Sequence, residues 1–227
     1  MNQQKFWRVE STASQSKLAE WADGEMKLES IFCPANEGHR RGGKRLTDLS
    51  VVLPGSNTQD FVWTWYSECL LTDRVLELFK AEGFTGFEIK PVKTRYKKAK
   101  QTPPRLWELV VTGWAGMAPQ ETGVELIESK SCQTCNHAVY SACLYPDKLI
   151  DESQWDGSDF FMVWPLPKYI FITDRVAEAI RREHLTGAVL KPPSELTFSG
   201  GGFGPGRLSR WMPEARAREL GEPLGIY

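Results

Sequence analysis

TDRVLELFKAEGFTGFEIKP, residues 72–91, returns along the chain as TDRVAEAIRREHLTGAVLKP, residues 173–192, at an offset of 101. Ten of the twenty aligned positions are identical, and apolar positions change conservatively, as where Phe84 becomes Leu185. An offset this long is typical of one duplicated unit, because repeat arrays have periods of about 20–50 residues. We therefore interpret the chain as an internal duplication.

Each copy of this stretch has the pattern of a strand, a helix and a second strand. An aromatic, apolar run typical of strands precedes it, residues 61–71 in one copy and 160–172 in the other. A Thr-Asp pair then predicts an N-cap and a negative charge at the positive end of a helix. Gly86 and Gly187 are predicted to close the helices with φ > 0, and FEIKP and AVLKP to be short strands that end at proline. The capping residues are Thr72, Asp73, Thr173 and Asp174.

Composition excludes several classes of protein. The chain has 227 residues, of which 41% are apolar, so it can bury a sizeable core. A net charge of −1 shows no bias towards nucleic acid or membrane. No apolar run approaches the ~20 residues of a spanning helix, and the N-terminus lacks an apolar signal region, so a cytoplasmic location is expected. Five Cys is an odd number, which argues against a full disulfide framework.

Further predicted elements surround the repeated stretch. Residues 5–10 and 105–111 are expected to form the first strand of each half, and residues 26–34 and 122–132 a second matching pair. The other predicted elements are a short helix at 16–24, a loop at 35–45, a strand at 47–55 and a helix at 213–220.

Together these elements predict an α+β fold. It consists of two duplicated sheet-plus-helix halves with a pseudo-two-fold relation, joined by a structural zinc site. The expected boundaries are 1–100 for the first half, 101–195 for the second, and 196–227 for a C-terminal extension packed on the body.

Three segments differ between the copies and are candidates for partner contact. The linker 93–105 is basic and fits either a solvated connector or a contact with phosphate or an acidic partner. Residues 147–159 carry five carboxylates and only one base, Lys148, which fits a solvated loop, acid–base catalysis or a surface for a basic partner. Residues 200–206 are glycine-rich but lack the Gly-Lys-Ser/Thr of a phosphate loop, so they indicate a flexible turn.

The cysteines predict a metal site at one point of the duplication. Cys132 and Cys135 form a C-x-x-C pair, which is a common half of a structural zinc site. Cys33 lies 99 residues before Cys132, Asn36 replaces the second cysteine of the pair, and His39 follows. Zinc accepts Cys and His at comparable distances. A zinc site of Cys33, His39, Cys132 and Cys135 would therefore tie the halves together.

Other interpretations of the cysteines stay open. His137 and Cys143 are alternative fourth ligands, or the first copy has decayed and no metal binds. A redox dithiol is a further alternative, although a strand leading into a helix at the motif is not indicated. Cys69 is predicted to be a core residue, and His184, on the second repeated helix, a surface residue.

No catalytic pattern is found, because neither Ser nor Cys stands in a nucleophile motif and zinc with four protein ligands has no open position. We therefore predict a protein that is not an enzyme. Two alternatives remain. One is an enzyme with a site between the halves. The other is a zinc-stabilised nucleic-acid-binding or regulatory protein, which the basic linker favours and the near-neutral charge opposes.

These segments resemble the double-CXXCG motif immunity proteins of myxobacteria. The matching pieces are KFWRVE near the start, Cys33-Pro34, TDLS at 47–50, Cys132-x-x-Cys135, and FITDRVAEAIRREHLTGAVLKP near the end. The chain departs from the motif where Asn36 replaces a cysteine, and where Glu37 and Asn136 replace glycines. The resemblance implies a non-enzymatic cytoplasmic protein that binds and neutralises a cognate polymorphic toxin. It also implies that the toxin is a nuclease, and that neither membrane nor nucleic acid is a direct partner.

Overall fold

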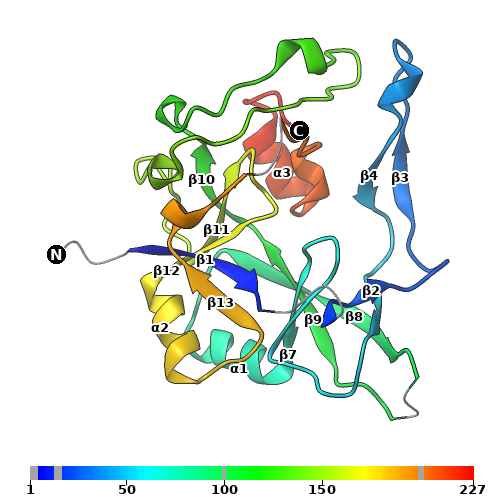
Figure 1. The fold of residues 1–227 in the computed structure, drawn as a ribbon, viewed down its shortest axis with the longest axis vertical. Coiled ribbons are helices and arrows are strands. Elements are labelled where there is room, and N and C mark those ends of the chain that lie inside the picture. Colours follow the sequence, from blue (N-terminus) through cyan, green and yellow to red (C-terminus); the bar gives the residue numbers. More distant parts are fainter. Residues whose placement is uncertain (1–4, 13–16, 99–100, 199–201) are drawn as a thin grey trace.

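The computed structural model describes residues 5–12, 17–98, 101–198 and 202–227. Within these ranges the strands form three sheets, accompanied by three α-helices, which confirms the α+β class (Figure 1). The helices are α1 (Asp73–Ala81), α2 (Asp174–Arg182) and α3 (Glu214–Gly221). None of the helices in the described ranges is long and apolar enough to cross a membrane.

Two of the sheets make up the body of the protein. The six-stranded sheet contains, in spatial order, β2 (Glu20–Trp21), β5 (Ser50–Leu53), β8 (Phe87–Tyr96), β9 (Leu106–Val111), β7 (Cys69–Thr72) and β6 (Phe61–Trp63). The five-stranded sheet contains β10 (Gly113–Met117), β11 (Phe160–Trp164), β12 (Ile170–Thr173), β1 (Phe6–Ser11) and β13 (Ala188–Lys191).

The third sheet is a hairpin of β3 (Leu28–Ile31) and β4 (Arg41–Arg45), and we call residues 28–45 the arm. The arm stands at one side of the body, and α3 lies between it and the five-stranded sheet (Figure 1).

The repeated stretch forms β7, α1 and β8 in its first copy and β12, α2 and β13 in its second. The two strands predicted to begin the halves pair with the opposite copies. β1 lies antiparallel between β12 and β13, and β9 lies antiparallel between β7 and β8. Each body sheet therefore combines segments from both predicted halves. The pseudo-two-fold relation and the domain boundaries stay predictions.

Thr85 and Thr186, which form a Thr-Gly pair with Gly86 and Gly187, are each held by an aspartate. Asp159 directly precedes β11 and Asp60 directly precedes β6, so each aspartate comes from the other copy. The Asp159 carboxylate accepts hydrogen bonds from the backbone N–H (3.0 Å) and the hydroxyl (3.2 Å) of Thr85. The Asp60 carboxylate accepts the same two bonds from Thr186, at 2.8 and 2.9 Å. Arg175 also binds Asp159, at 2.7 Å. These matching contacts fasten the two sheets to each other.

Gly86 and Gly187 lie where two backbone segments approach each other closely. Gly86 and Gly187 have φ of +85° and +88°, which confirms the predicted positive values. A Cβ at Gly86 would lie 2.0 Å from the carbonyl oxygen of Phe160, and one at Gly187 would lie 2.1 Å from that of Phe61. Only glycine fits such a contact. These two glycines therefore allow the backbones of the two body sheets to pack in direct contact.

The helices themselves end earlier than predicted. Gly83 and His184, which directly follow the C-caps, have φ of 65° and 51° and take the left-handed conformation that closes a helix. Thr72 and Thr173 occupy the predicted N-cap positions with extended backbones, but neither side chain caps its helix. The hydroxyl of Thr173 instead donates to Asp159 at 2.9 Å.

The aromatic runs are buried, as predicted, but each forms a hairpin rather than one strand. Residues 61–71 divide into β6 and β7, and residues 160–172 into β11 and β12, with antiparallel pairing in both. In the first run the turn places Ser67 at φ 74° and leaves Trp65 and Tyr66 49% and 53% exposed.

Several local predictions were wrong because tertiary pairing decides the structure. The predicted helix at 16–24 contains β2, which pairs with β5; residue 16 lies outside the described residues. The predicted strand at 122–132 forms two 3₁₀ turns and isolated bridges. The predicted loop at 35–45 contains β4, since its Gly and Arg residues pair with β3. β8 continues beyond Pro91 because β9 and then β5 supply partners.

The charged segments are more ordered than expected. Residues 93–96 of the basic linker belong to β8, and Lys97 and Arg105 pair with Glu20 and Asp73. Residues 99 and 100 of that linker, and residues 200 and 201 of the glycine-rich segment, lie outside the described residues.

The acidic segment has basic partners that the sequence did not reveal. Asp159 pairs with Arg175, Asp156 with Arg216 at 2.9 Å, and Glu152 with Lys5. The predicted helix at 213–220 is confirmed as α3, and its Ala217 is fully buried in the main core.

Replacing Asp159 with Asn should destabilise the protein by about 2–4 kcal/mol, because the amide cannot accept from all the donors of Thr85, Thr173 and Arg175 and leaves Arg175 without its carboxylate partner. Burial raises the pKa of Asp159, but its hydrogen bonds from Arg175, Thr85 and Thr173 lower the pKa overall. The carboxylate therefore stabilises the fold above about pH 4, and this stability is lost as pH falls through the lowered value.

Urea unfolding of wild type and Asp159→Asn between pH 3 and 7 measures both effects. The difference between the two proteins should be largest near neutrality and should shrink in acid. Asp147→Asn is the control, since Asp147 is exposed and its replacement should change stability by less than about 0.5 kcal/mol. Equal effects of the two substitutions would contradict the assigned role of Asp159.

Candidate metal centre

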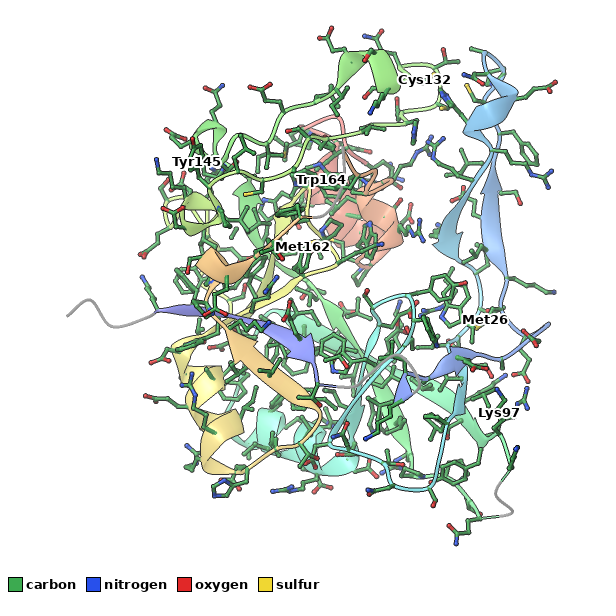
Figure 2. All side chains as sticks on the ribbon, viewed as in Figure 1. Met26, Lys97, Cys132, Tyr145, Met162 and Trp164 are labelled. Atoms are coloured by element: carbon green, nitrogen blue, oxygen red, sulfur yellow. The ribbon has the colours of Figure 1, made fainter. Side chains whose placement is uncertain are left out.

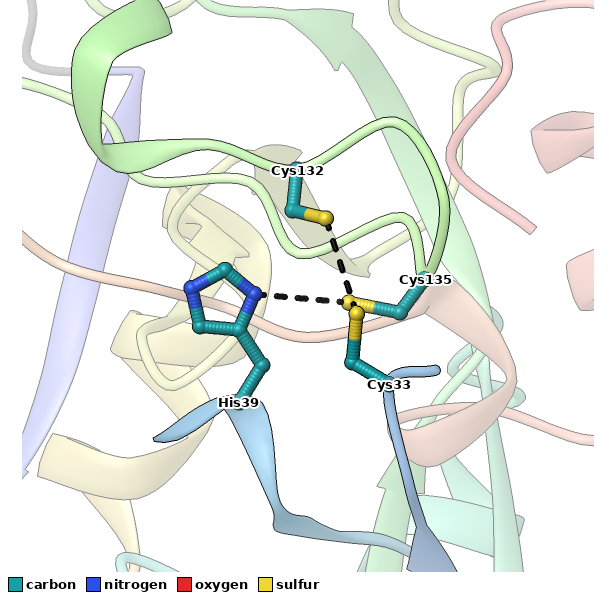
Figure 3. Close-up of side chains that lie close together, drawn as sticks. All are labelled: Cys33, His39, Cys132 and Cys135. Atoms are coloured by element: carbon teal, nitrogen blue, oxygen red, sulfur yellow. Dashed lines mark hydrogen bonds between the residues drawn. The ribbon is translucent and has the colours of Figure 1, made fainter. Parts of the chain in front are cut away.

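The tip of the arm meets the turn at residues 132–135, and four side chains lie together there (Figure 3). Cys33 follows β3, and His39 ends a 3₁₀ turn (Glu37–His39) that leads into β4. Cys132 and Cys135 lie on one tight turn, which is closed by backbone hydrogen bonds between Cys132 and His137 in both directions, at 2.7 and 3.1 Å. The two chain segments thus present their ligand atoms to one point.

The distances suit a single metal ion. One Sγ or ring nitrogen from each of the four residues lies within 4.8 Å of all the others. Sγ of Cys33 is 3.7 Å from Sγ of Cys132, and Sγ of Cys135 is 3.8 Å from Nδ1 of His39. Tetrahedral bonds of about 2.0–2.3 Å would separate ligand atoms by roughly 3.4–3.8 Å. The five cysteines are free of disulfides. Cys33, His39, Cys132 and Cys135 therefore lie close enough to bind a metal.

Asn36, which stands at the position of the absent cysteine, supports the site from outside. Its Oδ1 accepts a hydrogen bond from the backbone N–H of Gly38 at 2.9 Å, and so caps the 3₁₀ turn that carries His39. Its Nδ2 lies 3.3 Å from Nε2 of His39, the ring nitrogen that faces away from the sulfurs. Contacts to the second ring nitrogen fix the orientation of a metal-binding histidine.

Arg41 is a functional residue that the sequence analysis missed. Its guanidinium donates to Sγ of Cys135 at 3.3 Å and to the carbonyl oxygen of Cys135 at 2.6 Å. A positive group beside a sulfur stabilises the thiolate, which is the form that binds metals. The only sequence signal for Arg41 was its place in a charged segment after His39.

The site favours ionised sulfur even without a metal. The backbone N–H of Cys135, followed by His39, lowers the pKa of Cys132 to about 6. Burial opposes ionisation of Cys135, but Arg41, Cys33 and His39 lower its pKa overall. Burial raises the pKa of Cys33. Contacts with Cys132 and then Cys135 raise the pKa of His39. These contacts favour the thiolate forms of Cys132 and Cys135 and the protonated form of His39.

The other predicted residues lie around the cluster or far from it. The ring of His137 is centred 5.0 Å from that of His39 but does not belong to the four-ligand group. Cys143 is buried in a separate apolar cluster with Leu149 and Phe161. Cys69 is 1% exposed, which confirms its prediction as a core residue, and His184 is exposed, as predicted.

Comparison with protein-family models places most of the chain in one family. Residues 44–194 match the sequence model of an immunity protein family, Imm11, which covers about two thirds of the chain and includes both copies of the repeated stretch. The matched range holds Cys132 and Cys135, whereas Cys33 and His39 precede it. No curated protein matches the chain.

In chelator-treated protein, iodoacetamide should modify Cys132 with a rate that reaches half its maximum near pH 6, because the thiolate is the reactive form. Peptide mass spectrometry over pH 5–9 measures the rate at each cysteine. Cys69 is the internal control, since burial raises its pKa and shields it from the reagent. A Cys132 rate that rises only between pH 8 and 9 would contradict the described electrostatics.

Proposed function

Because this chain belongs to the Imm11 immunity protein family, we propose that it protects its host cell by binding a polymorphic toxin stoichiometrically. The match over residues 44–194 is the observation that carries the proposal. As the resemblance to double-CXXCG immunity proteins implies, the proposed toxin is a nuclease and the proposed site of action is the cytoplasm. Protection would require no catalysis by this chain, only occlusion of the toxin.

We further propose that the metal is zinc and that its role is structural. Three cysteines and one histidine form one of the usual donor sets of structural zinc sites, in which all four positions belong to the protein. The ion would join the tip of the arm to the turn at 132–135. At its other end the arm is held by Lys44, which pairs with Glu214 at 2.8 Å, and by Arg45, which pairs with Glu108. Zinc would thus fasten the free end of the arm.

The proposed immunity function is tested by co-expression with the toxin encoded beside this gene. Cells that produce the toxin should survive when wild-type protein is also produced, and the two proteins should co-purify in a fixed ratio. The matched control is a second toxin of the same activity from an unrelated locus, against which this chain should give no protection. Undiminished toxicity together with no co-purification of the neighbouring toxin would refute the proposal.

The zinc proposal predicts about one zinc per chain by elemental analysis of protein purified without added metal. Cys33→Ser, His39→Ala and Cys132→Ser should each lose the metal, because each removes a ligand. Cys143→Ala and His137→Gln are the controls and should keep it, as these side chains lie outside the four-ligand group.

Removal of zinc should also expose the arm. Limited proteolysis of chelator-treated protein should cut within residues 32–40, because that end loses its attachment. Full zinc content in all three ligand variants would show that the site has been assigned to the wrong residues.

A further inference from the structure

A groove of about 450 Å³ lies between the arm and the body, away from the metal centre. Its walls come mainly from five segments that are remote in sequence: residues 43–46 at the end of β4, the turn at 66–69, residues 108–111 of β9, residues 167–170, and residues 209–214, which lead into α3. Trp21, Leu28, Lys90 and Met162 complete the lining. The last of these five segments leads into α3, which lies between the arm and the five-stranded sheet (Figure 1).

Large apolar side chains stand at the groove without being buried. The rings of Trp21 and Tyr66 stack with their centroids 4.0 Å apart, and Tyr66 remains 53% exposed. Leu46, which directly follows the arm, is 58% exposed, and Trp211 also lines the groove. Exposed aromatic groups that border a cavity are typical of protein-binding sites, where Trp and Tyr contribute much of the binding energy.

The groove has a positive charge that the molecule as a whole lacks. Five cationic and three anionic side chains line it, which gives +2, whereas the whole chain has a net charge of −1. The carboxylates are already used, since Glu68 and Glu108 pair with Arg45, and Glu214 pairs with Lys44. Among the described residues no ion pair holds the remaining three cations, which are Lys90, Lys168 and Arg210.

We propose that this groove is the toxin-docking surface, and that it takes a segment of the toxin in which an apolar side chain is flanked by carboxylates. The apolar group would pack on Tyr66 and Trp211, and the carboxylates would pair with Lys168 and Arg210. Charge complementarity selects this occupant, because unpaired cations attract acidic groups and reject basic ones. This inference rests on the proposed immunity function and adds the place and chemistry of binding.

The other charged segment is poorly suited to the same role. In the acidic segment 147–159, Asp156 and Asp159 are engaged by Arg216 and Arg175 of this chain. A toxin that bound there would have to displace these pairs. The groove instead offers three cations that hold no ion pair among the described residues, beside aromatic side chains that are only partly buried.

The test compares two pairs of substitutions of the same kind. Tyr66→Ala with Lys168→Glu alters the groove. Tyr145→Ala with Lys148→Glu is the control, because Tyr145 is 54% exposed and Lys148 lies 5.5 Å over its ring. Figure 2 shows Tyr145 on the far side of the molecule from Met26, which lies near the base of the arm. Circular dichroism and zinc content establish that both variants are folded.

Binding of each variant to the purified product of the neighbouring toxin gene is measured by calorimetry. The groove variant should bind at least 30-fold more weakly than wild type, as expected for loss of a binding hot spot, and the control should bind within about threefold of wild type. Carbodiimide treatment of the wild-type complex should join toxin Asp or Glu residues to Lys168, Lys90 or Lys44.

The outcomes separate the two proposals. If wild type binds the toxin but the groove variant binds equally well, and the cross-links map elsewhere, the docking surface is wrong while immunity stands. If the groove is instead covered by a second copy of this chain, wild type will be a dimer that the groove variant dissociates, which also overturns the inference. If wild-type protein does not bind or neutralise the toxin, the immunity function itself fails.

Discussion

The structure depends on the place where the Thr-Gly pair of each copy meets the strand of the other. At this junction the backbones approach so closely that a single added carbon would overlap a carbonyl oxygen. Asp60 and Asp159 secure the contact by accepting hydrogen bonds from both polar groups of the facing threonine. Because the contact is made twice, it fixes both the separation and the rotation of the two body sheets. The core aromatic residues Phe79 and Phe160, whose rings lie 5.0 Å apart, pack across the same junction.

The sequence predicted those features that local chemistry dictates. The helices after Thr72 and Thr173 and the strands that begin near residues 6 and 106 are where the patterns placed them. Alignment of the two copies also predicted that Cys33 and His39 lie beside the C-x-x-C pair. This prediction was possible because the residue types that bind zinc are recognisable in the sequence. A local sequence pattern does not predict, however, which remote segment a Thr-Gly pair will contact. Gly86 was therefore interpreted as a helix terminator, although its close contact is with Phe160.

The sequence-based predictions that were wrong share one physical origin, which is contact between segments remote in sequence. Residues 20 and 21 lie in the segment 16–24, whose sequence predicts a short helix. Pairing with β5 and stacking of Trp21 on Tyr66 make them a strand instead. Arg41 and the groove were not predictable, because each is defined by segments that meet only in the folded chain. The acidic segment was interpreted as solvated for want of visible bases, and the bases proved to be Arg175, Arg216 and Lys5. Asn36 was seen as a lost ligand, whereas it caps the turn that presents His39.

β1 pairs with the second copy of the repeated stretch and β9 with the first, and this pairing has a consequence for synthesis on the ribosome. The sheet that contains β9 is built from residues 20–111, so its strands are all available before half of the chain has been made. β1 precedes all the other described strands in the chain, yet its partners β12 and β13 end only at Lys191. At about 5–20 residues per second, β1 must wait roughly 10–40 s for them. During that time β1 is an aromatic strand without its two sheet partners, so it needs shielding from other unpaired strand edges.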